Sequence, residues 1–161
     1  PNVDAMIYFV DKILPLIHTN IADIKLYITG SDPPSEITSL ASDKIIVTGY
    51  VPNIEPYLNR CRISVAPLRF GAGVKGKVNL SMSYGLPVVL TPIAAEGMFL
   101  THEEEALIAD TPEEFATAVI RLYTDETLWK KLSYHGLQNI RKYFSYKVAK
   151  ESLQSIVAKS K

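Results

Sequence analysis

The chain has 161 residues, of which 47% are hydrophobic, and this is enough for the core of one domain. Its 17 lysines and arginines balance its 17 aspartates and glutamates, so the net charge gives no support for nucleic acid or an anionic membrane as a partner. The single cysteine, Cys61, excludes an internal disulfide and suits a reduced, cytoplasmic setting. No apolar run approaches the roughly 20 residues of a membrane-spanning helix. Membrane contact is therefore expected only through parts of a longer parent protein.

A helix is predicted over residues 2–17, because apolar side chains recur there at steps of three and four. Pro15 is expected to bend or end this helix. Short apolar runs follow, each ending in turn residues, and they predict buried parallel strands at residues 24–28, 45–47, 63–66, 87–90 and 106–109. Helices are predicted between them at residues 35–40, 54–60 and 75–84. The pattern predicts a Rossmann-like, doubly wound α/β domain with a mainly parallel sheet.

The last third of the chain predicts a helical C-terminal extension. Thr111, Pro112 and Glu114 have the spacing of a capping box with proline at the first helical position. A second helix is expected after Asp125, with Gly136 weakening or breaking it, and a third over residues 145–157. The charges on these helices are most simply a solvated face.

The first predicted element is a helix, whereas a doubly wound domain normally opens with a strand that becomes central in the sheet. We therefore expect a single domain, residues 1–161, that is truncated before its first strand. The strands at residues 24–28 and 63–66 should then flank a gap, or a substitute for the missing strand, and should not pair with each other.

The stretch PLRFGAGVKGKVNLSMSYGLPVV, which begins at Pro67, carries the strongest chemical signal. Gly71 and Gly73, with Val74 between them and the lysines, precede a predicted helix that holds Lys75 and Lys77. Glycines allow close approach of backbone N–H groups to an anion, and a helix N-terminus favours phosphate. The spacing matches neither GxxxxGK[ST] nor GxGxxG. It predicts a diphosphate site, and the alternative is a plain glycine turn with surface lysines.

Several segments together resemble the C-terminal domain of retaining, family-four type glycosyltransferases with the GT-B architecture. The likeness covers nearly the whole chain in order, through PNVDAMIYFVDKILPLI, LYITGS, IIVTGYVPNIEPYLNRCRISVAPL, GAGVKGK, SYGLPVVLT and AAEGM. The resemblance implies that the chain is the donor-binding, C-terminal half of a GT-B fold. It also implies that an N-terminal acceptor domain, and a strand before the first helix, belong to the parent protein.

The resemblance assigns the nucleotide base to the segment Gly49, Tyr50 and Val51. Tyr50 would stack on the base and the Val51 peptide group would bond it. An equally simple interpretation makes Tyr50 an ordinary core residue after a strand.

Many family members have two glutamates separated by seven residues that contact the sugar and the ribose. Ala72 and Leu80 occupy the matching positions here, so both carboxylates are missing. Asn79 and Ser81 flank the second position and are candidates for the lost ribose contacts.

Glu96 follows the strand at residues 87–90 and is a candidate sugar ligand, with a solvated loop charge as the alternative. His18, His102 and His135 show no spacing that predicts a metal site, although Glu103 follows His102 directly in an acidic run. We therefore expect no metal and no cofactor. The substrate expected from the resemblance is a UDP- or GDP-type sugar.

The resemblance implies that the parent is a hexosyltransferase-type enzyme moving a sugar from this donor to an acceptor hydroxyl. No catalytic residue is assigned, and the isolated fragment should be inactive because the acceptor domain is absent. Two alternatives remain: a GT-B epimerase or phosphorylase-like enzyme, and a non-catalytic interaction module suggested by the lost glutamates.

Overall fold

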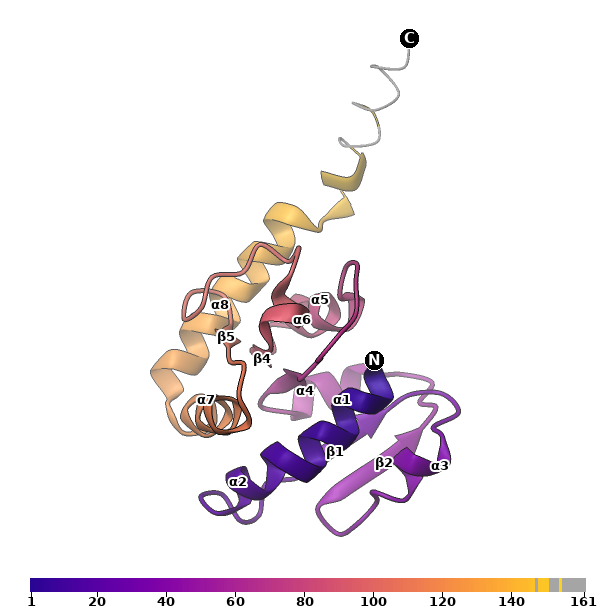
Figure 1. The fold of residues 1–161 in the computed structure, drawn as a ribbon. Helices are drawn as coiled ribbons and strands as arrows, with labels where there is room; N and C mark the ends of the chain where they lie inside the picture. Colours follow the sequence, from indigo (N-terminus) through magenta and orange to yellow (C-terminus); the bar gives the residue numbers. More distant parts are fainter. Residues whose placement is uncertain (147, 151–153, 155–161) are drawn as a thin grey trace.

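The computed structural model describes residues 1–146, 148–150 and 154, and is shown in Figure 1. Its strands form two parallel sheets. The strands are β1 (Leu26–Thr29), β2 (Ile45–Gly49), β3 (Ser64–Ala66), β4 (Val88–Leu90) and β5 (Leu107–Ile108). The first sheet has the order β1-β2 and the second the order β3-β4-β5. The five predicted strands and their parallel direction are confirmed.

The two sheets are not hydrogen-bonded to each other in the described part of the chain. β1 and β3 are left as separate edge strands, which is the arrangement predicted for the neighbours of a missing central strand. Both sheets nevertheless share one hydrophobic core, which includes Ile45 of β2, Val89 of β4 and Leu107 of β5. A strand that would fill the gap stays a prediction.

The first predicted helix continues through Pro15 as three connected segments. These are α1 (Asn2–Tyr8), the π-helical η1 (Phe9–Ile13) and α2 (Leu14–His18). Proline has no N–H, so the carbonyl of Asp11 loses its ordinary helical partner, and a π-helical turn accommodates the defect. The buried side chains of Phe9, Ile13 and Ile17 anchor the helix in the shared core.

Short helices lie between the strands, and two longer helices close the domain (Figure 1). They are α3 (Ser35–Thr38), α4 (Glu55–Arg60), α5 (Gly76–Ser83), α6 (Pro92–Ala95), α7 (Pro112–Thr124) and α8 (Glu126–Tyr143). The predicted capping box of α7 is confirmed: the Glu114 N–H donates to the Thr111 hydroxyl, and the Thr111 N–H donates to the Glu114 carboxylate, both at 3.2 Å. The sequence did not predict α6.

Gly136 does not break α8, so the prediction of a break at this residue is wrong. The residue is buried where α8 crosses α5. A Cβ atom at Gly136 would lie 3.2 Å from the Met82 methyl carbon and 3.5 Å from the Glu105 carbonyl oxygen. The glycine therefore permits close helix packing. The helix predicted over residues 145–157 lies largely outside the described residues.

Candidate functional site

A glycine-rich loop connects β3 to α5, and we call residues 67–75 the glycine loop. Gly71 has a φ of 133° and Gly73 a φ of 81°, in the region that glycine adopts without steric cost. The loop ends at Lys75, the N-cap residue of α5, and no side chain caps this helix. The Gly76 N–H donates to the Val74 carbonyl at 3.1 Å and the Val78 N–H to the Lys75 carbonyl at 2.9 Å. The Lys77 N–H has no such partner among the described residues and is a potential donor to an anion.

The two predicted lysines lie on either side of the start of α5. Lys75 is half-buried, and its ammonium donates to the Gly73 carbonyl at 2.8 Å. Lys77 is exposed in the first helical turn, and Val74 between the glycine turn and Lys75 is 65% exposed. The structure thus brings two cations, two glycine turns and a helix N-terminus together. This combination of charges and donors suits a phosphate group.

The loop after β4 lies beside the glycine loop because Thr91 joins them. The Thr91 N–H donates to the Ala66 carbonyl at 3.3 Å, and its buried hydroxyl donates to the Leu68 carbonyl at 2.6 Å. The same loop continues into α6 and reaches Glu96, which is exposed and is followed by Gly97 with a φ of 74°. Glu96 therefore has an exposed carboxylate in the segment that follows β4 and α6.

The carboxyl end of the other sheet carries the predicted base site. Gly49 ends β2 with a φ of 66°, and its carbonyl accepts the Gly30 N–H at 3.2 Å. Tyr50 is 72% exposed and is not a core residue. Its ring is free to stack on a flat ligand, and the neighbouring Val51 is half-buried.

The residues proposed to replace the missing glutamates differ in placement. Ser81 is 4% exposed, and its hydroxyl lies 2.9 Å from the Ser64 hydroxyl and 3.1 Å from the Lys77 carbonyl. This position in the core does not favour a ribose contact. Asn79 has a buried Oδ1 without a hydrogen-bond partner among the described residues. Leu80, at the position of the second glutamate, is 41% exposed.

The sequence analysis did not predict one ion pair, which joins Arg69 of the glycine loop to Asp4 of α1. The Arg69 guanidinium binds both carboxylate oxygens of Asp4, through Nε at 3.0 Å and through Nη2. This hydrogen bonding holds the pKa of the Asp4 carboxyl below its ordinary value. The partners are 65 residues apart, so no local pattern links them.

The three histidines have structural contacts. His18 Nε2 lies 3.2 Å from the Ile24 carbonyl, His102 Nδ1 accepts the Ile108 N–H, and His135 Nδ1 lies 3.0 Å from the Glu104 carbonyl. Within residues 1–146, 148–150 and 154, no three metal-ligating side chains gather. No helix among these residues has the length and apolar character needed to cross a membrane.

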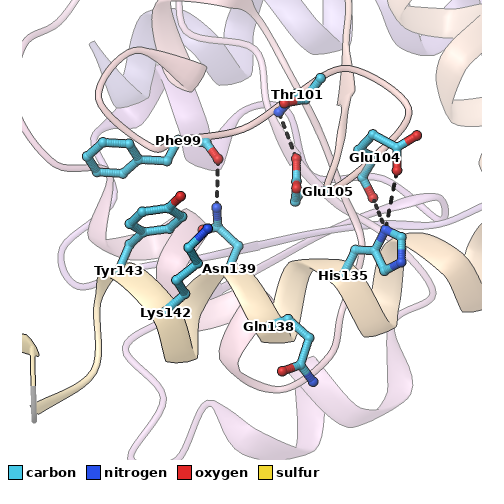
Figure 2. A pocket seen from close by; sticks show the side chains of 9 residues that line it. All are labelled: Phe99, Thr101, Glu104, Glu105, His135, Gln138, Asn139, Lys142 and Tyr143. Atoms are coloured by element: carbon cyan, nitrogen blue, oxygen red, sulfur yellow. Dashed lines mark hydrogen bonds and ion pairs between the residues drawn. The ribbon is translucent and has the colours of Figure 1, made fainter.

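A separate pocket of about 390 Å³ lies between the loop after α6 and the helix α8, as Figure 2 shows. Some of its polar groups bind one another: Asn139 donates to the Phe99 carbonyl at 2.7 Å, and the Thr101 N–H donates to the Glu105 carboxylate at 2.8 Å. The Phe99 ring stacks on Tyr143. These contacts fix the loop on α8. The residues predicted to hold the donor do not line this pocket.

Comparison with known proteins identifies the family. Residues 1–125 match the family model of glycosyl transferases group 1. A curated relative, an uncharacterised 44.6 kDa protein in the cps region of Klebsiella pneumoniae, is 27% identical over 156 residues. The match covers 91% of this chain and 40% of that protein. This chain therefore spans less than half of the relative's length.

Solved structures share the fold. The C-terminal domain of LpcC, a group 1 family glycosyl transferase from Francisella tularensis, aligns with a TM-score of 0.70 at 15% identity, over 86% of this chain and 78% of that one. TarM aligns with a TM-score of 0.77 at 16% identity, over 94% and 32%. HepE from Anabaena, in complex with UDP and glucose, aligns with a TM-score of 0.71 at 11% identity, over 91% and 45%.

The architecture is thus the Rossmann-like, C-terminal type found in GT-B glycosyltransferases, and the glycine loop, Lys75, Lys77 and the start of α5 follow the carboxyl end of β3. The family model covers most of the chain. The chain belongs to the group 1 glycosyl transferases.

Proposed function

We propose that this chain is the donor-binding, C-terminal domain of a retaining, family-four type glycosyltransferase. Its parent would move a sugar from a nucleoside-diphosphate sugar to an acceptor hydroxyl. Family membership supports sugar transfer, and the relative's greater length leaves room for an N-terminal acceptor domain. A strand that precedes Pro1 in the parent would complete the sheet between β1 and β3.

One observation carries the proposal: the glycine loop leads directly into the uncapped N-terminus of α5, with Lys75 and Lys77 beside it. Ligands of open α/β sheets bind at the carboxyl ends of the strands, where this loop lies. The donor diphosphate would bind there. Tyr50 and Val51 would hold the base, and Glu96 would contact the sugar.

The chemistry expected at this site is electrostatic. Negative charge grows on the diphosphate as it leaves the sugar, and preorganised N–H groups and ammonium groups stabilise this charge in the transition state. No cofactor is needed for this step. The acceptor site and the remaining catalytic groups would lie on the N-terminal domain, so the fragment alone would be inactive and the cytoplasmic parent active as a hexosyltransferase.

Because both family glutamates are missing, few residues remain as candidates for the ribose contact. Ala72 and Leu80 offer no hydrogen bond, and Ser81 is buried against Ser64. Asn79, whose Oδ1 has no partner among the described residues, is the remaining candidate on α5. We propose that weak ribose recognition is offset by the base and the diphosphate contacts.

Calorimetry on the full-length protein tests the site. UDP, GDP and ADP are titrated first, and the nucleotide that binds is compared with its nucleoside. Lys75→Ala and Lys77→Ala should each weaken diphosphate binding by about 1.5–3 kcal/mol, the range of a hydrogen bond to a charged group, and leave nucleoside binding unchanged.

Lys130→Ala is the matched control, because Lys130 is an exposed lysine on α8, paired with Glu126. It should change neither affinity. Equal diphosphate affinity in the wild type and both loop variants would remove the diphosphate site from the glycine loop. Parallel loss of both ligands, with a lowered melting temperature, would indicate damage to the fold.

A further inference from the structure

The glycine loop is held firmly at its root and more lightly along its length. At the root, buried Thr91 binds the carbonyls of Ala66 and Leu68. Toward its end, the Lys75 ammonium binds the Gly73 carbonyl within the loop itself. Glycine residues with positive φ make such a loop conformationally permissive. The part of the loop between these two sets of contacts is therefore held in place by a contact with another element of the fold.

Arg69 provides that contact, and it reaches the first turn of α1. Its guanidinium binds both oxygens of Asp4 and lies over the Tyr8 ring, with 4.9 Å between the guanidinium carbon and the ring centroid. The loop also approaches the start of α1 at Gly71, where a Cβ would lie 3.7 Å from that of Pro1. A bidentate pair fixes orientation as well as distance.

The pair is too exposed to be explained by global stability. The Arg69 and Asp4 side chains are 52% and 27% exposed, and exposed ion pairs contribute little to folding because solvent screens them. Even the small free-energy contribution of an exposed ion pair can change the ratio of ordered to disordered conformations of a flexible loop severalfold. The expected effect of the pair is therefore local, on the order of the loop.

The pairing also decides what Arg69 can do. Two of its N–H donors are directed to Asp4, and the carboxylate cancels its charge. Lys75 and Lys77 remain as the cations beside the start of α5. A direct phosphate contact by Arg69 would require it to leave Asp4.

We propose that Asp4 and Arg69 act as positioning residues that hold the glycine loop in the conformation that binds the donor diphosphate. This inference rests on the proposed function. Tyr8 supports the guanidinium from the side, and α1 serves as the fixed element against which the loop is placed. Neither member of the pair touches the diphosphate.

Asp4→Ala in the full-length protein separates positioning from direct contact. If Arg69 positions the loop, loss of Asp4 should raise the Kd for UDP, or for whichever nucleoside diphosphate the wild type binds, by about two- to fivefold. If Arg69 itself binds phosphate, loss of Asp4 frees the guanidinium and the Kd should stay equal or fall. An equal or lower Kd would overturn the proposal.

The exchanged pair Asp4→Arg with Arg69→Asp gives a second test. Each single reversal places like charges together and should weaken binding further, whereas the double variant should recover most of the wild-type affinity. Arg121→Ala is the matched control, since Arg121 also pairs with a carboxylate, that of Glu103, and its side chain is 48% exposed. This control should bind like the wild type. Failure of the exchanged pair to recover would contradict a positioning role.

Amide hydrogen exchange without ligand separates this proposal from the proposed function. Asp4→Ala and Arg69→Ala should speed exchange in residues 70–76 while leaving β4 unchanged. If the wild type binds no nucleoside diphosphate, the proposed function fails, and faster loop exchange would still support an ordering role for the pair. Unchanged exchange in both variants would refute the pair as an anchor of the loop.

Discussion

The strands β3 and β4 are neighbours in one sheet, but their side chains are buried to different extents. In β4, Val88, Val89 and Leu90 are 1%, 0% and 0% exposed. The residues of β3 are all only partly buried, and β1 is partly buried with one exposed tyrosine. β4 has a strand on each side and contacts α5, α6 and α7, whereas β3 and β1 each have one strand neighbour.

Composition does not account for this difference, because β1 and β3 also contain Leu26, Ile28 and Val65. The number of neighbouring strands and helices accounts for the difference in burial. An unpaired strand edge leaves both backbone groups and flanking side chains open to solvent, and proteins usually cover or charge such an edge. The apolar side chains on the edge strands β1 and β3 would allow a further strand to pack between them.

The largest expected effect tests burial directly. Leu90→Ala should destabilise the protein by about 2–5 kcal/mol, since it removes a fully buried side chain and leaves a cavity. Ile28→Ala, in half-buried β1, should cost about 1–2 kcal/mol because part of that side chain is already hydrated. Urea unfolding of both variants measures the difference, and equal costs would contradict it.

The same two substitutions in the full-length protein make this test more specific. If a strand of the parent fills the gap, Ile28 becomes buried in the full-length protein. The cost of Ile28→Ala should then approach that of Leu90→Ala there, while the cost of Leu90→Ala stays the same. An unchanged ratio in the longer protein would argue against a filled gap.

Alanine substitutions at two glycines, one next to each sheet, should differ by a smaller amount in their effect on stability. Gly85, before β4, has a φ of 70°, and an added Cβ would lie 3.2 Å from the Ser133 hydroxyl oxygen. Gly85→Ala should therefore cost about 1–2 kcal/mol. Gly30, after β1, has open space around it, so Gly30→Ala should be neutral or stabilising by about 0.4–1 kcal/mol. Thermal melts of the two variants should move in different directions or by clearly different amounts.

The smallest expected effect concerns the Asp4–Arg69 ion pair, which joins α1 to the glycine loop. Arg69 lowers the pKa of Asp4, so the folded state gains from the charged carboxylate above the ordinary pKa and loses this gain as the pH falls through the lowered one. The melting temperature of Asp4→Asn should lie slightly below that of the wild type at neutral pH. The two curves should converge in the acidic range below about pH 4. A difference that is independent of pH would exclude the carboxylate charge as its cause.

Local signals in the sequence predicted the conformation of the glycine loop. The run from Pro67 to Lys77 carries its own turn chemistry, because glycine adopts positive φ wherever the chain places it. The structure accordingly has Gly71 and Gly73 in such conformations just before α5. The start of α7 was equally predictable, since a capping box is formed within four residues.

Contacts between distant residues were not predictable in this way. Tyr50 had two equal interpretations, and its exposure depends on which elements cover the end of β2. Ser81 is adjacent to an exposed leucine, yet helical geometry turns it toward Ser64 in β3. The Asp4–Arg69 pair joins elements 65 residues apart, and no periodicity records such a meeting.

The sequence by itself determined the order of the strands and of the helices other than α6, the glycine turns and the capping box of α7, because each depends on neighbours within a few residues. The tertiary structure alone decided the burial of Ser81 against Ser64, the uninterrupted passage of α8 through Gly136 and the pairing of Arg69 with Asp4. Each of these depends on which surfaces pack together. Packing is set by the simultaneous burial of many distant side chains, so it appears only when the whole chain is folded.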